Sequence, residues 1–243
     1  MGYFHSRPVD LRGIAKYLMK LDVKERLSIL GDFKKLRQLL FGKDLEQLDP
    51  HVSTHGEAWV YAAKSQITSL LFGSSKSNGD LDGIITMKDG KICFKEAYEG
   101  AFKERFGGAR CMLYEVDSST FEEGRTSFDG EVVSSKPAKI LSKRKVTNIQ
   151  EELMAAIERG EFELVTYKKD DPAYVSEIEA HIIDRMKDCD LEKNTNDSRV
   201  KFFRKKFPQL YKKMLEEQQA AKKAGTKKPA VQESAEEAGG PEM

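Results

Sequence analysis

The segment that most constrains the fold lies at residues 52–72 and reads VSTHGEAWVYAAKSQITSLLF. Trp59, Val60 and Tyr61 are followed by two alanines, and this aromatic and β-branched content predicts a short buried strand. Beyond Ser65 the apolar residues recur three and four positions apart, which is the spacing of one helix face, and Ser65 stands where an N-cap is expected. The chain is therefore expected to run from a central strand directly into a helix, with Tyr61 on the strand.

The composition predicts a soluble protein with one main domain and appendages. The chain has 243 residues, of which 39% are hydrophobic and 33% charged. A formal net charge of +1 gives no overall basic field, so binding to nucleic acid or to an anionic membrane would require a local patch. We expect no membrane partner.

The cysteines and the start of the chain indicate a cytoplasmic location. Cys93, Cys111 and Cys189 are widely separated and form no C-x-x-C pair, which argues against a disulfide framework and a structural zinc site. We expect reduced thiols and no bound metal. No apolar run approaches the ~18 residues of a membrane span, and the first residues form no signal peptide. The protein is expected in the cytoplasm, or delivered into a host cytoplasm without a classical signal peptide.

The first two thirds of the chain are predicted to mix helices and short strands. Residues 3–6 form a strand that ends at Arg7-Pro8, and residues 10–41 contain two or three amphipathic helices. The other expected strands are residues 84–87 and 92–94, joined by a turn at Asp89-Gly90, and residues 111–116, 131–134 and 137–141. A helix is expected within residues 96–106. This pattern predicts an α+β fold.

The last third is predicted to be helical and then disordered. Helices are expected at residues 149–157 and 173–186, with an extended segment at 162–167 between them. Residues 200–215 are predicted as one basic helix, and residues 218–243 as a disordered tail because they carry little apolar surface. The expected domains are residues 1–190, with a helical insert at about 10–44, then the basic helix at 191–217 and the tail at 218–243.

Several short motifs, taken in order, point to one superfamily. They are Tyr-Phe-His-Ser at residues 3–6, Leu-Asp-Pro at 48–50, Trp-Val-Tyr-Ala-Ala at 59–63, Gly-Ala-Phe at 100–102, Leu-Tyr-Glu-Val-Asp at 113–117, Phe121, and Glu-Val-Val-Ser at 131–134. Over roughly residues 3–160 this order resembles the ADP-ribosyltransferase superfamily of the diphtheria-toxin and poly-ADP-ribose-polymerase type. The resemblance implies a split, twisted β-sheet, here with an N-terminal helical insert and a helical C-terminal appendage.

The resemblance also implies an activity and a His-Tyr-Glu site. The activity is NAD-dependent transfer of ADP-ribose to a macromolecular acceptor, protein or nucleic acid, with NAD as the substrate. His5 would donate a hydrogen bond to the adenosine ribose, Tyr61 would stack on the nicotinamide, and Glu131 would stabilise the positive charge that develops on the ribose in the transition state. Ser6 would contact the cofactor where the family usually has glycine.

Two points stay open at the level of sequence. His55 is followed by Gly56, as the family's motif histidine usually is, so His55 is the second candidate for the role given to His5. The residue two positions before Glu131 is Asp129, where arginine-directed members have glutamate, so an arginine acceptor is not supported.

A second hypothesis assigns the chain no catalytic role. On the same fold, the basic segment KFFRKKF at residues 201–207 would bind nucleic acid or protein as a non-catalytic module. Its lysines and arginine would neutralise phosphates while the phenylalanines stacked on bases. The competing interpretation is a surface helix whose phenylalanines pack on its own domain.

Overall fold

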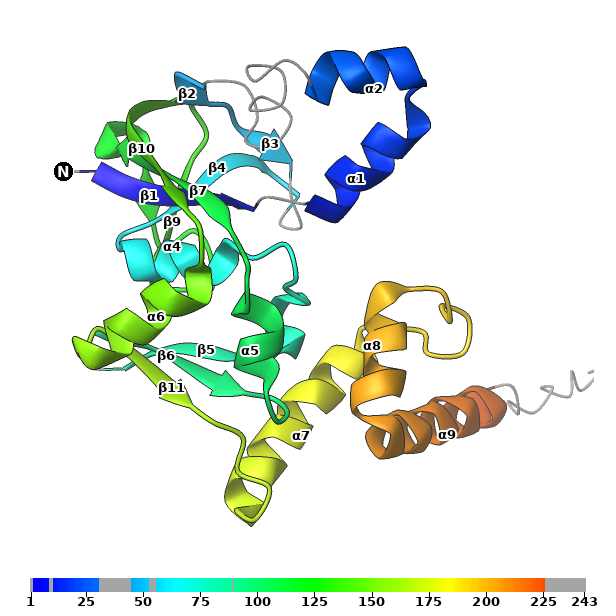
Figure 1. The fold of residues 1–243 in the computed structure, drawn as a ribbon. Helices are drawn as coiled ribbons and strands as arrows, with labels where there is room; N and C mark the ends of the chain where they lie inside the picture. The colour runs from blue at the N-terminus through cyan, green and yellow to red at the C-terminus, as the bar shows by residue number, and fades with distance from the viewer. Residues whose placement is uncertain (1, 9–10, 31–44, 53–55, 89, 226–243) are drawn as a thin grey trace, which may run out of the picture. The chain divides into compact units, whose positions relative to one another are not determined.

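The computed structural model describes residues 2–8, 11–30, 45–52, 56–88 and 90–225. The chain divides into two compact units, Met1–Asp170 and Asp171–Met243, so the boundary lies at Asp170 and not near residue 190 as the sequence predicted. The first unit contains strands and helices, whereas the described part of the second unit is helical (Figure 1). The α+β class predicted from the sequence is confirmed.

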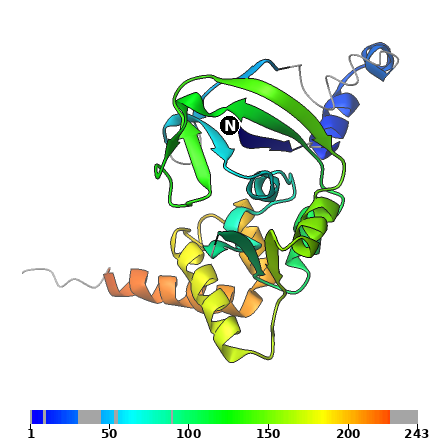
Figure 2. The ribbon, with the colours of Figure 1, turned by 90° about the vertical axis from the view of Figure 1, so that its left-hand side faces the viewer.

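The larger sheet of the first unit has eight strands and is antiparallel throughout. Its order is β2-β10-β7-β1-β4-β9-β8, with β3 paired to β4, and the strands curve around one another (Figure 2). The bounds are β1 (Gly2–Pro8), β2 (Gln47–Leu48), β3 (His51–Val52), β4 (Ala58–Ala63), β7 (Cys111–Asp117), β8 (Glu122–Glu123), β9 (Glu131–Ser134) and β10 (Ala138–Val146). Although β10 follows β9 along the chain, it pairs with β7 and β2.

The sheet opens between its two central strands. β1 pairs with β7 along its whole length, from Gly2 opposite Asp117 to Pro8 opposite Cys111. Its described pairing with β4, by contrast, is the single position Phe4 opposite Ala63. A gap in the ladder leaves room for side chains between two strands that would otherwise be joined by backbone hydrogen bonds.

A three-stranded sheet and the helices α4, α5 and α6 also belong to the first unit. The sheet has the order β11-β6-β5, with bounds β5 (Gly83–Lys88), β6 (Lys91–Glu96) and β11 (Phe162–Val165). The hairpin predicted around Asp89-Gly90 is confirmed, since Lys88 pairs with Lys91 and Gly90 has the positive φ of 74° that such a turn requires. The helices are α4 (Gln66–Phe72), α5 (Ala101–Phe106) and α6 (Ile149–Glu158). The helix predicted within residues 96–106 is shorter than expected, because Glu96 belongs to β6.

Strand β7 contributes to two hydrophobic cores through its two faces. Cys111 and Leu113 pack into a core formed with α4, α5, α6 and β6. Tyr114 and Val116 pack into a second core with residues of β2, β4, β9 and β10. Because side chains alternate across a strand, a strand with apolar residues on both faces can join two layers.

The helical insert begins as predicted, with α1 (Leu11–Lys20) and α2 (Val23–Leu30). The apolar positions expected at residues 33–41 lie outside the described residues. None of the helices in the described part of the chain combines the length and the apolarity needed to cross a membrane.

The second unit contains α7 (Pro172–Lys187), α8 (Ser198–Lys206) and α9 (Pro208–Gly225). The prediction of one helix over residues 200–215 is wrong, because Pro208 has no amide hydrogen and Phe207 before it leaves helical geometry, with φ −130° and ψ 55°. The prediction of a disordered tail is wrong for residues 218–225, which belong to α9, and residues 226–243 lie outside the described residues. Gln218 lies within α9, where its amide donates to the carbonyl of Cys189 and accepts from the backbone of Leu191.

Candidate functional site

The strand-to-helix segment predicted from the sequence is present as β4 followed directly by α4. The side chain of Ser65 caps α4, because its hydroxyl accepts a hydrogen bond from the backbone nitrogen of Thr68 at 3.1 Å. Only Lys64 and Ser65 separate the strand from the helix. The short connection fixes the first turn of α4 beside the end of β4.

A pocket of about 380 Å³, partly open to solvent, lies where β1, β4, α4 and β9 meet. The residues that line it are Phe4, His5, Ser6, Tyr61, Ala62, Ala63, Ser69, Phe72 and Glu131. Four of the five residues predicted from the sequence, His5, Ser6, Tyr61 and Glu131, therefore meet in one pocket. His55, the fifth, lies outside the described residues.

Tyr61 and Glu131 lie on the same face of neighbouring strands. Ala63 of β4 pairs directly with Glu131 of β9, and Tyr61 pairs with Val133. Because side chains alternate along a strand, Tyr61 and Glu131 are diagonal neighbours on one face, a placement that typically separates Cα atoms by about 7–8 Å. An aromatic ring and a carboxylate thus face the same small volume.

His5 fills part of the opening between β1 and β4. Its Nδ1 lies 2.7 Å from the backbone oxygen of Tyr61. A carbonyl oxygen only accepts hydrogen bonds, so Nδ1 carries the hydrogen and donates it. Burial lowers the pKa of His5, the hydrogen bond to Tyr61 opposes that shift, and the positive charges of His51 and Arg7 lower the pKa further. The ring is therefore neutral at pH 7 and its Nε2 is an acceptor, which corrects the donor role expected from the sequence.

No protein family, curated protein or solved structure matches this chain.

The sequence analysis missed Ser69, which lies in the pocket wall on α4. Its hydroxyl is buried, and among the residues that the structure describes it has no hydrogen-bond partner. Leaving a buried hydroxyl unpaired costs about 1–3 kcal/mol, so Ser69 is a destabilising feature of this wall as the structure stands. The available signal was its position one turn after the N-cap Ser65, on the face of α4 that also holds Phe72.

Ser6 has a different role from the one expected. Its hydroxyl donates to the backbone oxygen of Ser69 at 2.6 Å, which ties β1 to α4 across the pocket floor. On the other wall, the ring of Phe72 is 45% exposed and meets Phe128 edge to face, with ring centroids 6.0 Å apart. The pocket surface thus has a polar part, held by the hydrogen bond between Ser6 and Ser69, and an apolar part formed by Phe72.

Neighbouring aromatic rings hold the ring of Tyr61 in place. Trp59 lies edge to face with it at 5.9 Å between centroids, and His51 of β3 lies at 6.5 Å. Arg125 covers the other side of Trp59, with its guanidinium carbon 5.7 Å from the ring centroid. His51 is a second residue of the site region that the sequence analysis did not single out.

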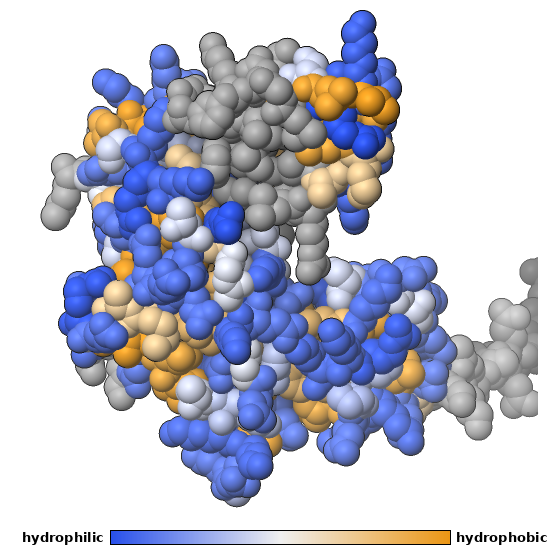
Figure 3. Space-filling view, viewed as in Figure 1, coloured by the Kyte–Doolittle hydropathy of each residue, from blue (hydrophilic) through white to orange (hydrophobic). Residues whose placement is uncertain are grey.

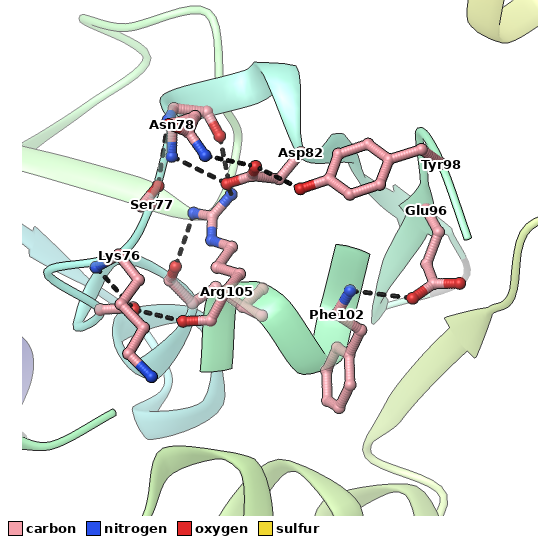
Figure 4. Close-up of polar contacts among 11 residues, drawn as sticks. Lys76, Ser77, Asn78, Asp82, Glu96, Tyr98, Phe102 and Arg105 are labelled. Atoms are coloured by element: carbon pink, nitrogen blue, oxygen red, sulfur yellow. Dashed lines mark hydrogen bonds and ion pairs between the residues drawn. The ribbon is translucent and has the colours of Figure 1, made fainter. Parts of the chain in front are cut away.

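A buried arginine fixes the end of α4. Arg105 of α5 donates from Nη2 to the backbone oxygen of Leu71 at 2.8 Å and from Nη1 to the backbone oxygen of Gly79 at 2.7 Å (Figure 4). Its Nη1 also lies 3.8 Å from a carboxylate oxygen of Asp82, which in turn accepts hydrogen bonds from Asn78. This cluster holds the C-terminal turn of α4, and with it the wall formed by Ser69 and Phe72, against the loop that follows.

Within the described residues, no group of three or more histidines, cysteines or carboxylates is arranged to hold a metal ion.

The burial of neutral His5 predicts a pH-dependent stability. Because the folded pKa is depressed, the unfolded state binds the proton first, and stability falls as the pH drops through the ordinary histidine pKa of about 6.5. One such group contributes at most about 1.4 kcal/mol per pH unit. Urea unfolding of the parent and of His5→Gln between pH 7.5 and 5.5 is expected to give a smaller loss of stability in the variant. Equal losses would contradict the assignment of a buried neutral ring.

Proposed function

We propose that the pocket binds NAD and that the protein transfers ADP-ribose from it to a macromolecular acceptor. The observation that carries the proposal is the meeting of His5, Tyr61 and Glu131, from three strands that are distant in sequence, around one pocket. The opening of the sheet between β1 and β4 supports the split β-sheet that such a fold requires. The sequence alone predicts these three residues as a site, so their proximity in the fold is an independent argument.

Each residue has a chemical role in this reaction. The bond between nicotinamide and the ribose C1′ breaks, its electron pair leaves with nicotinamide, and the ribose acquires oxocarbenium character. The carboxylate of Glu131 stabilises that positive charge. Because the charge is absent from the ground state, this stabilisation lowers the barrier and accelerates the step. A nucleophilic oxygen or nitrogen of the acceptor then bonds to C1′ and loses its proton to solvent.

The other side chains of the pocket suit the binding of NAD and take no part in the bond-breaking step. The ring of Tyr61, held by Trp59 and His51, offers a face on which nicotinamide stacks. Nε2 of His5 suits a ribose hydroxyl as donor. Fixing the ligand with several weak contacts holds the scissile bond near the carboxylate.

The test of the function is the release of nicotinamide from NAD labelled in the nicotinamide ring. The purified protein is incubated with NAD alone and with a cell lysate, and label transfer from adenine-labelled NAD to macromolecules is followed in parallel. We expect release in both reactions and transfer only with lysate. A protein that neither binds NAD in calorimetry nor releases nicotinamide would leave the non-catalytic binding module as the better hypothesis.

The choice between His5 and His55 is tested by NAD affinity. His5→Asn keeps an amide donor near the carbonyl of Tyr61 but lacks an acceptor at the position of Nε2. Losing one neutral hydrogen bond costs about 0.5–1.5 kcal/mol, so we expect a dissociation constant that is raised about 2- to 10-fold. His55→Ala is expected to bind like the parent, with circular dichroism as the control for folding in both. The reverse ranking would assign the role to His55.

A further inference from the structure

The helix α8 contains positively charged residues and no acidic ones. Residues 198–215 contain no aspartate or glutamate and seven cations, Arg199, Lys201, Arg204, Lys205, Lys206, Lys212 and Lys213. The surface over α8 and α9 that faces the viewer is largely hydrophilic (Figure 3). In the described part of the second unit, the acidic residues lie on α7 and at its two ends, in the loop before α8, and at Glu216 and Glu217 of α9.

Three of these cations form one exposed face, which we call the cationic face: Lys201, Arg204 and Lys205. Their spacing of three and four residues places them on one side of α8 within about 6 Å along the helix axis. The buried side chains of the helix, Val200, Phe202 and Phe203, point away from this side. Across the described residues, the structure gives none of the three cations an ion pair.

Other charges near α8 are already neutralised. Arg199 contacts Asp197 at 3.4 Å, and Lys222 contacts both Asp190 and Glu192 at 3.0–3.1 Å. The positive charges of the cationic face are therefore available to an external partner. The acidic residues of the loop before α8 are instead paired with Lys222 and Arg199 of the same unit.

The phenylalanines of α8 do not take part in binding. Phe202 is 8% exposed, Phe203 is fully buried, and the two rings meet edge to face at 6.3 Å between centroids. The stacking of bases on these two rings, which was one of the interpretations of the sequence, is therefore excluded, and both rings are packed within their own domain. Phe207, the third phenylalanine of the segment, follows the end of α8 and is half-buried. The exposed side of α8 therefore presents charged side chains and neither of these aromatic rings.

We propose that the cationic face binds the phosphate backbone of a nucleic acid without reading its sequence. Lysine is depleted in protein–protein interfaces, whereas nucleic-acid interfaces are rich in positive charge. Arg204 supplies a bidentate donor for a phosphate and the two lysines supply point charges. An interfacial membrane helix would need apolar side chains on its outward face, and here the apolar side of α8 is buried. This proposal does not depend on NAD binding.

The test measures binding of the full chain to a fluorescently labelled DNA duplex of mixed sequence by anisotropy, as a function of salt. Three phosphate contacts predict that affinity falls about 40-fold between about 50 and 200 mM salt. The variant Lys201→Gln/Arg204→Gln/Lys205→Gln is expected to have a log–log salt slope shallower by about 2–3. The matched control Lys103→Gln/Lys168→Gln/Lys169→Gln removes the same charge from other exposed positions and is expected to retain the parent's slope.

Each outcome supports or overturns the proposal. A steep slope in the parent and in the control, but not in the α8 variant, supports it. No binding by the parent at the lowest salt, or equal losses in both triple variants, overturns it. If poly-glutamate of matched charge competes as well as unlabelled duplex, the face binds acidic polymers in general, and the assignment to nucleic acid is wrong.

Discussion

Glu131→Gln is expected to lower the rate of nicotinamide release by at least ~10²-fold, while NAD affinity changes only a few-fold. The substitution keeps the shape and hydrogen bonding of the side chain and removes the charge that stabilises the ribose in the transition state. Loss of one electrostatic contact made only in the transition state commonly has this size. The rate is measured under saturating NAD, and the affinity by calorimetry on the same preparation.

Asp129→Asn is the matched control for this experiment. It removes the same charge two residues earlier, from an exposed position that does not line the pocket. We expect nicotinamide release by this variant to stay within about twofold of the parent. Unchanged turnover in Glu131→Gln, or a comparable loss in Asp129→Asn, would remove Glu131 from the mechanism.

Arg105→Met is expected to destabilise the first unit by about 3–5 kcal/mol, because it leaves the carboxylate of Asp82 buried without its cation. The side chains of Arg105 and Asp82 are only 2% and 1% exposed, so solvent cannot replace the lost partner. The variant also frees the backbone oxygens of Leu71 and Gly79. Denaturant unfolding measures the loss, and weaker NAD binding in the folded fraction would report movement of α4.

Two further variants test the cause of that loss. Arg159→Met removes an exposed ion pair with Glu161, at 2.8 Å with both side chains about half exposed, and is expected to leave the denaturant midpoint close to that of the parent. The double variant Arg105→Met/Asp82→Asn is expected to recover part of the stability lost in Arg105→Met, since it removes the unpaired charge. No recovery would mean that the lost backbone contacts, and not the charge, dominate.

The local elements could be predicted because their signals lie within a few residues. Each of three predicted features depends on a pattern of only a few neighbouring residues. These features are the change from strand to helix after Ser65, the turn at Asp89-Gly90 and the strand that begins at Glu131. The prediction that His5, Tyr61 and Glu131 belong to one site came from a resemblance and not from periodicity. The register of β1, β4 and β9 places them around the pocket.

Other features depend on contacts that the sequence does not display. The missing hydrogen-bond partner of Ser69, the opening between β1 and β4, and the tautomer of His5 follow from packing between distant segments. The order of strands puts β10 beside β7, which local patterns cannot show. The break at Pro208, in contrast, is visible in the sequence, because proline has no amide hydrogen and biases the residue before it away from helical geometry.

The central position of β1 also bears on how the first unit folds. Strand β1 pairs along its whole length with β7, more than 100 residues further along the chain, and the pocket includes Glu131, which comes later still. Loop-closure entropy must be overcome before such distant pairings stabilise anything, so folding of this unit is expected to be slow for its size. During synthesis, β1 lacks the partner with which it pairs along its whole length until residues 111–117 leave the ribosome, and no complete pocket forms before the chain passes residue 131.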